Sequence, residues 1–131
     1  MTLTTKEIVE KCALDSYAGL LTFPEVLSKL VSVGVESYFA DYRNHSTHYY
    51  LSTNEAIRIS MQMPAIDIPN TFNKEDVKAA IRGAQSYQVR YPEFLKLTMA
   101  AGCIGYMVWI TGRHVSYFGR QGEVHVEYFP D

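Results

Sequence analysis

Glu123, His125 and Glu127 occupy every second position near the end of the chain. On a β-strand such side chains share one face, so they could bind one metal ion or act together in acid-base catalysis. The charged side of a one-sided antiparallel sheet shows the same alternation, and we favour a solvent-facing strand side. Catalysis remains an alternative, with His114, His125, Glu123 and Glu127 as its candidate residues.

Two arginines follow glycines at predicted turns, in Gly112-Arg113 and Gly119-Arg120. A guanidinium group matches the geometry of carboxylates and phosphates, so Arg113 and Arg120 could bind an anionic ligand if they share one rim of the sheet. Turn geometry alone also explains the glycines. We favour plain turns and keep the anion-binding rim as a hypothesis.

The chain contains ten tyrosines and one tryptophan. Aromatic rings with a polar tip are typical of strands and of binding faces. The sequence therefore predicts an aromatic groove that binds a small molecule or a protein partner. The residues expected to line it are Tyr38, Tyr49, Tyr106, Trp109 and Tyr117.

No pattern for a metal site, a cofactor or a named enzyme class is found. His45 and His48 have loosely metal-like spacing beside Asp41, but they span a predicted turn where polar residues are expected. Cys12 and Cys103 show no CxxC spacing, so both are expected to be reduced and buried. We therefore predict neither a metal nor a cofactor.

Composition indicates an ordinary globular protein. The 131 residues are 47% hydrophobic and 20% charged, and the net charge of −2 disfavours nucleic-acid binding. The longest apolar run, Met99 to Ile110, has twelve residues, whereas a membrane-spanning helix needs about 20. The polar start of the chain lacks a secretory signal, so a cytoplasmic location is expected. We predict a single domain over residues 1–131.

The two halves of the chain resemble each other. Phe23-Pro-Glu-Val-Leu and Tyr91-Pro-Glu-Phe-Leu lie 68 positions apart (91 − 23), and the same offset pairs Gly34 with Gly102. The matches fall where helices begin or end, which favours an internal pseudo-repeat of residues 5–63 and 73–131 with a linker at 64–72. Any two segments of helix and strand share some of this punctuation, so chance similarity is the alternative.

Each half is predicted to contain two helices followed by three strands. Capping signals and helical periodicity place the helices at about 5–14, 23–33, 74–87 and 92–101. Alternation and turn signals place the strands at 36–42, 47–51, 55–61, 104–111, 113–118 and 123–129. The predicted fold class is α+β, a two-layer sandwich in which helices pack on an antiparallel sheet built from two α-α-β-β-β halves.

The stretch at residues 101–130, together with the Phe23-Pro-x-x-Leu-x-x-Leu and Gly34-Val-x-x-Tyr38 patterns, resembles the YbcV and YdfO-like bacterial and prophage proteins. That family has no known function and is sometimes labelled "phage envelope protein". The resemblance implies a small α+β fold and a bacterial or prophage setting. It implies no activity, cofactor or catalytic residue.

Two classes of function follow. The first is a non-catalytic binding or regulatory domain for a small molecule or a protein partner, with no role in binding nucleic acid or membranes. The alternative is a small hydrolase or isomerase that uses His, Glu and Arg side chains of the last three strands, provided that at least two converge in a pocket. A homodimer that pairs exposed strand edges is a further possibility.

Overall fold

The computed structural model of the chain describes residues 3–130. Met1, Thr2 and Asp131, which belong to the predicted domain, lie outside the described residues. The helices are α1 (Thr5–Tyr17), α2 (Phe23–Ser32), α3 (Lys74–Gln85) and α4 (Tyr91–Ala100). The strands are β1 (Val35–Asp41), β2 (Ser46–Leu51), β3 (Ala56–Ser60), β4 (Cys103–Trp109), β5 (His114–Gly119) and β6 (Val124–Tyr128).

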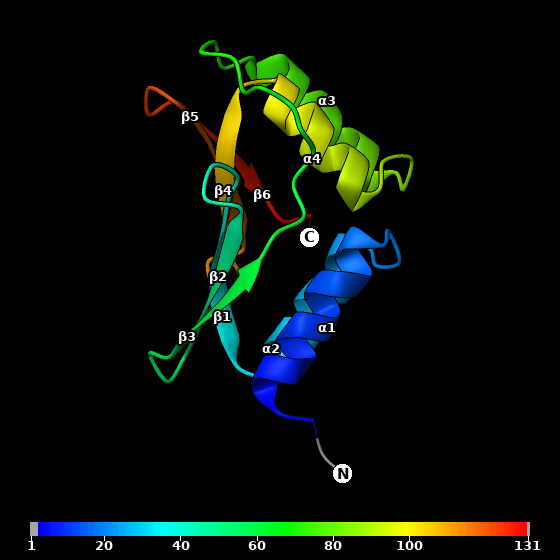
Figure 1. Ribbon diagram of the computed structural model, residues 1–131, viewed down its shortest axis with the longest axis vertical. Helices are drawn as coiled ribbons and strands as arrows, with labels where there is room; N and C mark the ends of the chain where they lie inside the picture. Colours follow the sequence, from blue (N-terminus) through cyan, green and yellow to red (C-terminus); the bar gives the residue numbers. More distant parts are fainter. Residues whose placement is uncertain (1–2, 131) are drawn as a thin grey trace.

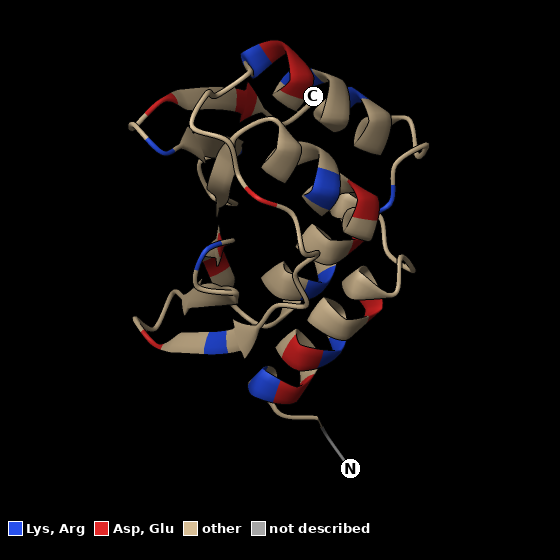
Figure 2. Cartoon of the chain, turned by 45° about the horizontal axis from the view of Figure 1, so that its top comes forward, with Lys and Arg blue, Asp and Glu red and all other residues tan. Residues whose placement is uncertain are grey.

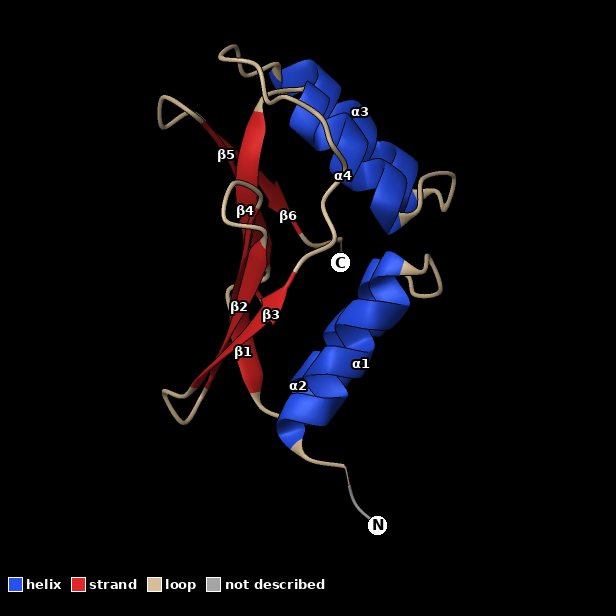
Figure 3. Ribbon diagram, viewed as in Figure 1, coloured by secondary structure: helices blue, strands red, loops and turns tan. Residues whose placement is uncertain are grey.

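The six strands form one antiparallel sheet in the order β3-β2-β1-β4-β5-β6. All four helices lie on the same face of this sheet, with α1 and α2 beside one half and α3 and α4 beside the other (Figures 1 and 3). We call the covered side the inner face and the uncovered side the outer face. The predicted α+β fold with helices packed on an antiparallel sheet is confirmed.

Side chains that satisfy the first backbone N–H groups explain three of the four helix starts. Thr4 and Thr22 each form a capping box with the glutamate three residues later, and Asn73 accepts a hydrogen bond from the Asp76 backbone N–H. Arg90, which precedes α4, makes no such bond. The start of α4 is therefore held by its packing and by Pro92 rather than by a cap.

Two predicted helix ends were wrong by a few residues. Helix α1 continues to Tyr17 rather than ending near Leu14, since Ser16 donates to the Cys12 carbonyl and the left-handed Gly19 follows only two residues after Tyr17. Helix α3 ends at Gln85 instead of Tyr87, which has a left-handed backbone with φ of 62°. Both ends are set by backbone conformations that apolar periodicity does not report.

The backbone of the second half repeats that of the first at the same offset of 68 residues. Every strand, together with α2 and α4, has equivalent bounds in both halves. Left-handed residues also occur in equivalent pairs, which are Gly19 and Tyr87, Gly34 and Gly102, His45 and Arg113, and Asn54 and Gly122. The central pair of β1 and β4, Phe39 and Met107, joins equivalent residues. The elements of the two halves thus correspond in order and position, while the internal pseudo-repeat stays a prediction.

The core lies between the helices and the inner face of the sheet. Its centre is a row of four buried tyrosines, Tyr38, Tyr49, Tyr106 and Tyr117, whose rings contact one another at centroid distances of 5.3–6.4 Å. Charged residues gather on the helices and at the hairpin turns (Figure 2). Within residues 3–130, no helix is long and apolar enough to cross a membrane.

Candidate functional site

A cavity of about 350 Å³ lies where the two helix pairs meet above the centre of the sheet. Its floor is formed by the buried tyrosine row, and buried residues of α1, α3 and α4 form its walls. The rim is more exposed and includes Phe23 and Tyr87, with exposed fractions of 40% and 60%. A concave site with apolar walls and few polar groups is the usual form of a small-molecule pocket.

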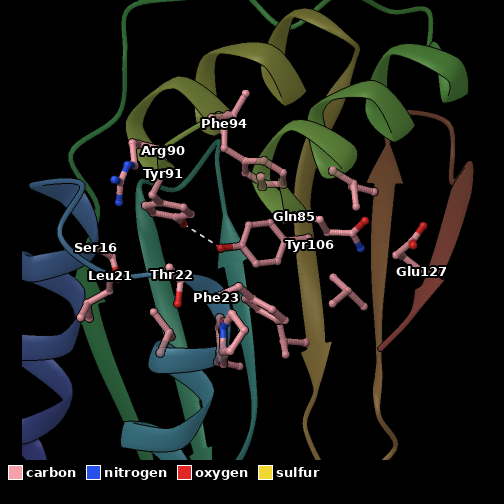
Figure 4. Close-up of a pocket in the computed structure, with 18 of the residues that line it drawn as sticks. Ser16, Leu21, Thr22, Phe23, Gln85, Arg90, Tyr91, Phe94, Tyr106 and Glu127 are labelled. Atoms are coloured by element: carbon pink, nitrogen blue, oxygen red, sulfur yellow. Dashed lines mark hydrogen bonds between the residues drawn. The ribbon is translucent and has the colours of Figure 1, made fainter. Parts of the chain in front are cut away.

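A hydrogen bond joins the floor of the cavity to the start of α4. The hydroxyl groups of Tyr91, at the start of α4, and Tyr106, on β4, are 2.7 Å apart and point toward each other (Figure 4). Burial raises the pKa of both phenols well above the usual range, so both stay protonated. Since only one of them donates to the other, one hydroxyl hydrogen of the pair remains for a further acceptor.

Two other floor tyrosines have hydroxyl groups without a protein partner. Tyr38 and Tyr117 are 5% and 6% exposed, and among residues 3–130 neither hydroxyl makes a hydrogen bond. The same residues contain no fully enclosed side-chain nitrogen or oxygen atom that lacks a partner. Both tyrosines line the cavity, so their hydroxyl groups reach its interior and can bind a polar group of an occupant.

The charged side chains among the described lining residues are Arg90 and Glu127. They lie on opposite sides of the cavity in Figure 4. Arg90 is exposed and donates from one guanidinium nitrogen to the Gly19 carbonyl at 3.2 Å. That bond ties the loop before α4 to the loop after α1, which are equivalent segments of the two halves.

Glu127 is held by two partners, and this corrects the expected orientation of β6. Its carboxylate accepts from Arg82 of α3 at 2.8 Å and from His125 at 3.3 Å. Burial tends to raise its pKa, but these hydrogen bonds and charges lower it overall. His125 is only 6% exposed and its ring stacks on Tyr117. The solvent-facing interpretation was wrong, because the polar side of β6 faces the helices.

The other two candidate catalytic residues lie elsewhere. Glu123 accepts a hydrogen bond from the Gln121 backbone and so closes the turn between β5 and β6. His114 is on the outer face between the rings of Trp109 and Tyr128, and its Nδ1 donates to the Gly112 carbonyl at 3.1 Å. His125 and Glu127 are thus within hydrogen-bond reach of each other, but they do not converge with His114 or Glu123.

The two candidate anion-binding arginines do not share a rim. Arg113 precedes β5 and Arg120 follows it, so the strand separates them. Arg113 lies over the Phe129 ring and donates to the Pro130 carbonyl at 3.4 Å. Arg120 donates to the Ile68 carbonyl at 3.1 Å. The hypothesis of a shared rim was wrong, since turns that bound one strand lie at its opposite ends.

Trp109 is also outside the cavity, although the other four expected aromatic residues line it. Alternation along β4 directs Tyr106 and Val108 to the inner face and Trp109 to the outer face, where it is 40% exposed. There it borders a shallow depression with Glu36 and Thr111. Its expected place was wrong because alternation separates it from Tyr106.

The cysteines and histidines form no metal centre within the described part of the chain. Cys12 and Cys103 are free and buried, and burial raises the pKa of these thiols to about 11 and about 12. Thiols with such pKa values are poor nucleophiles near neutral pH. Cys12 lines the cavity as a small apolar group.

Sequence reasoning missed several residues of the cavity because they lie on helices. Phe23 and Tyr91 are at equivalent first positions of α2 and α4, and Phe94 follows one turn after Tyr91. In the sequence, the Phe23-Pro24 and Tyr91-Pro92 motifs predict helix starts. The predicted pseudo-repeat is the signal that could have placed both aromatic rings at equivalent positions beside one cavity.

Comparison with protein families identifies the chain. A model of a protein family of unknown function, DUF1398, matches residues 12–127, and the chain belongs to this family. No curated protein matches it. The family is therefore established, whereas the narrower YbcV and YdfO-like grouping stays a prediction.

Proposed function

We propose that this member of the DUF1398 family binds a small, mainly apolar molecule in the cavity beneath its helix pairs. The main observation in support is that buried tyrosines line an aromatic cavity of about 350 Å³. Pockets for small ligands begin at about 300 Å³ and combine apolar walls with a few placed polar groups. A core with no ligand to bind would be expected to pack such a space closed.

The test is a thermal-shift screen of the purified protein against small aromatic and aliphatic compounds. A ligand that binds only the folded state at 100 times its Kd stabilises it by about 2.7 kcal/mol, which raises Tm measurably. We expect reproducible shifts that disappear in Ala84→Phe, since Ala84 lines the cavity and a benzyl side chain would fill it. Isothermal titration would then give the stoichiometry.

Two variants control this experiment. Ala100→Phe adds the same side chain at an exposed position outside the cavity, and Arg113→Ala removes a candidate residue that lies away from it. Both should retain every shift seen with the unchanged protein. Shifts that survive in Ala84→Phe but vanish in Arg113→Ala would contradict binding in this cavity.

Self-association is a second candidate, favoured by the outer face. Val124, Val126 and Tyr128 of β6 point outward with exposed fractions of 47%, 36% and 72%. Their outer-face neighbours on β4 and β5 include Trp109 and His114. The β4 to β6 part of this face contains no Asp, Glu, Lys or Arg, so two copies could meet there without burying charge.

Light scattering at high micromolar concentration tests this candidate. The unchanged protein should have the mass of a dimer, and Val126→Lys should have that of a monomer because it would bury an unpaired ammonium group. Ser60→Lys, at the far edge of the same face, should remain dimeric. A monomer mass for the unchanged protein would exclude self-association in this range.

The biological setting is also part of the proposal. We propose a cytoplasmic protein that is encoded by a bacterium or a prophage and has a binding or regulatory role. We also propose that the chain is a single domain whose halves arose by duplication. The sequence resemblance and the repeated backbone support these statements. Fractionation of cells that express a tagged copy would test the location.

A further inference from the structure

The start of α4 differs from the equivalent start of α2. Thr22 caps α2, whereas Arg90 stands at the equivalent position before α4 and makes no capping bond. A threonine cap typically contributes about 1 kcal/mol to stability, and the positive end of a helix dipole disfavours a nearby cation. Helix capping therefore does not explain an arginine at this position, and its hydrogen bond to the Gly19 carbonyl uses only one guanidinium nitrogen.

Arg90 makes this side of the cavity positive. The N–H groups in the first turn of a helix have no partners within the helix, and here no side chain caps them. Glu25 is close enough for Arg90 to contribute to lowering its pKa, but its carboxylate already accepts from the Thr22 backbone at 2.9 Å. Glu127, on the opposite side, is paired with Arg82.

The cavity also contains hydroxyl groups that are free to donate to an acceptor atom of a ligand. The hydroxyl of Tyr38 is unpartnered although the residue is 95% buried, and the Tyr91 and Tyr106 pair beside it has one hydroxyl hydrogen to donate. All three tyrosines line the cavity, and Tyr91 is the first residue of α4. Neutral phenols donate hydrogen bonds to one another or to an oxygen-bearing group. A carboxylate accepts up to four hydrogen bonds.

We propose that the ligand is an aromatic carboxylic acid whose carboxylate binds between Arg90, the first turn of α4 and the tyrosine hydroxyl groups. This inference rests on the cavity-binding function proposed above. The aromatic body of the ligand packs against Phe94 and the tyrosine rings, which form the apolar part of the cavity. A single charge suits the site, since Arg90 is the one cation among the described lining residues.

Binding of 2-naphthoate and of 2-naphthamide, measured by isothermal titration, tests the inference. The two probes share size and shape and differ in charge. We expect naphthoate to bind about tenfold more tightly, which corresponds to one charge-assisted contact. Arg90→Gln should remove this preference, and Arg90→Lys should retain part of it.

Arg90→Thr separates a binding role from a structural one. It recreates the cap found at Thr22, so we expect Tm to rise by about 2–4 °C while the preference for naphthoate disappears. A preference that survives in Arg90→Thr would overturn the inference. Equal binding of both probes would also overturn it but leave cavity binding intact. Binding of neither probe would contradict the inference and the proposed function together.

Discussion

The edge strands β3 and β6 occupy equivalent places at opposite ends of the sheet, yet their side chains have opposite polarity. Strand β3 directs Ile57 and Ile59 toward the helices and Arg58 outward. Strand β6 directs His125 and Glu127 inward, with Val124 and Val126 outward. Helix α3 provides Arg82 for Glu127, whereas the equivalent residue of α1 is Leu14.

This difference shows that one backbone plan accommodates either polarity when a partner lies opposite. Glu127, on the inner side of β6, lines the cavity, and the apolar residues on the outer side of this strand are exposed. The β3 end contains neither feature. The β6 edge thus makes a polar contact with α3 at the cavity, whereas the β3 edge packs on the helices with apolar side chains.

The largest expected effect is the difference in stability between alanine variants of the equivalent glycines Gly34 and Gly102. Both have left-handed backbones, where alanine costs about 1–2 kcal/mol. A Cβ atom at Gly102 would also collide with the Thr71 carbonyl, whereas at Gly34 the nearest atom is 3.8 Å away. We expect Gly102→Ala to lower the free energy of unfolding by about 3 kcal/mol or more and Gly34→Ala by about half of that. Urea denaturation measures both, and equal losses would contradict the clash.

The next largest effect is expected from substitutions that reverse the polarity of the edge strands β3 and β6. Ile59→Glu places a carboxylate beside α1 without an arginine, so we expect a loss of about 2–3 kcal/mol. Glu127→Ile releases Arg82 to solvent, where it is already 58% exposed, and removes the 3.3 Å hydrogen bond to His125, so we expect a smaller loss of about 1 kcal/mol. Thermal unfolding of the two variants provides the comparison. Similar losses would show that the pairing with Arg82 does not explain the difference.

A smaller difference in stability is expected between substitutions at the starts of α2 and α4. Thr22→Ala removes the capping box of α2 and should lower the free energy of unfolding by about 1 kcal/mol. Arg90→Ala removes no cap and only an exposed hydrogen bond to the Gly19 carbonyl, so its effect should stay within about 0.5 kcal/mol. Denaturant titrations resolve this difference, and a larger loss in Arg90→Ala would assign the arginine a structural role.

The smallest effect depends on pH. Because the pKa of Glu127 is lowered on folding, its stabilisation is present above the pKa of the unfolded state and is lost as the pH falls through the folded value. The stability difference between the unchanged protein and Glu127→Gln should therefore be constant above a pH of about 5 and shrink below about 4.5. Urea denaturation across this range measures it. Ile59→Gln, which changes no titratable group, is the control.

Much of the fold could be predicted from local patterns. Capping motifs at Thr4, Thr22 and Asn73, the glycine stops and the alternating strands predicted four helices and six strands with small errors at their ends. The aromatic row could also be foreseen, since Tyr38, Tyr49, Tyr106 and Tyr117 recur at the repeat offset. Periodicity specifies which residues share a face but not which face is covered, and this is why the predicted solvent exposure of His125 and Glu127 is wrong.

By itself, the sequence determined the order of the helices and strands and the helix ends at Gly34 and Gly102, because propensity, capping and alternation act between near neighbours. Tertiary structure decided the strand order and brought the starts of α2 and α4 together around one cavity. It also paired Arg82 with Glu127 across 45 residues. Such contacts depend on how distant segments pack, and no short-range pattern in the chain records them.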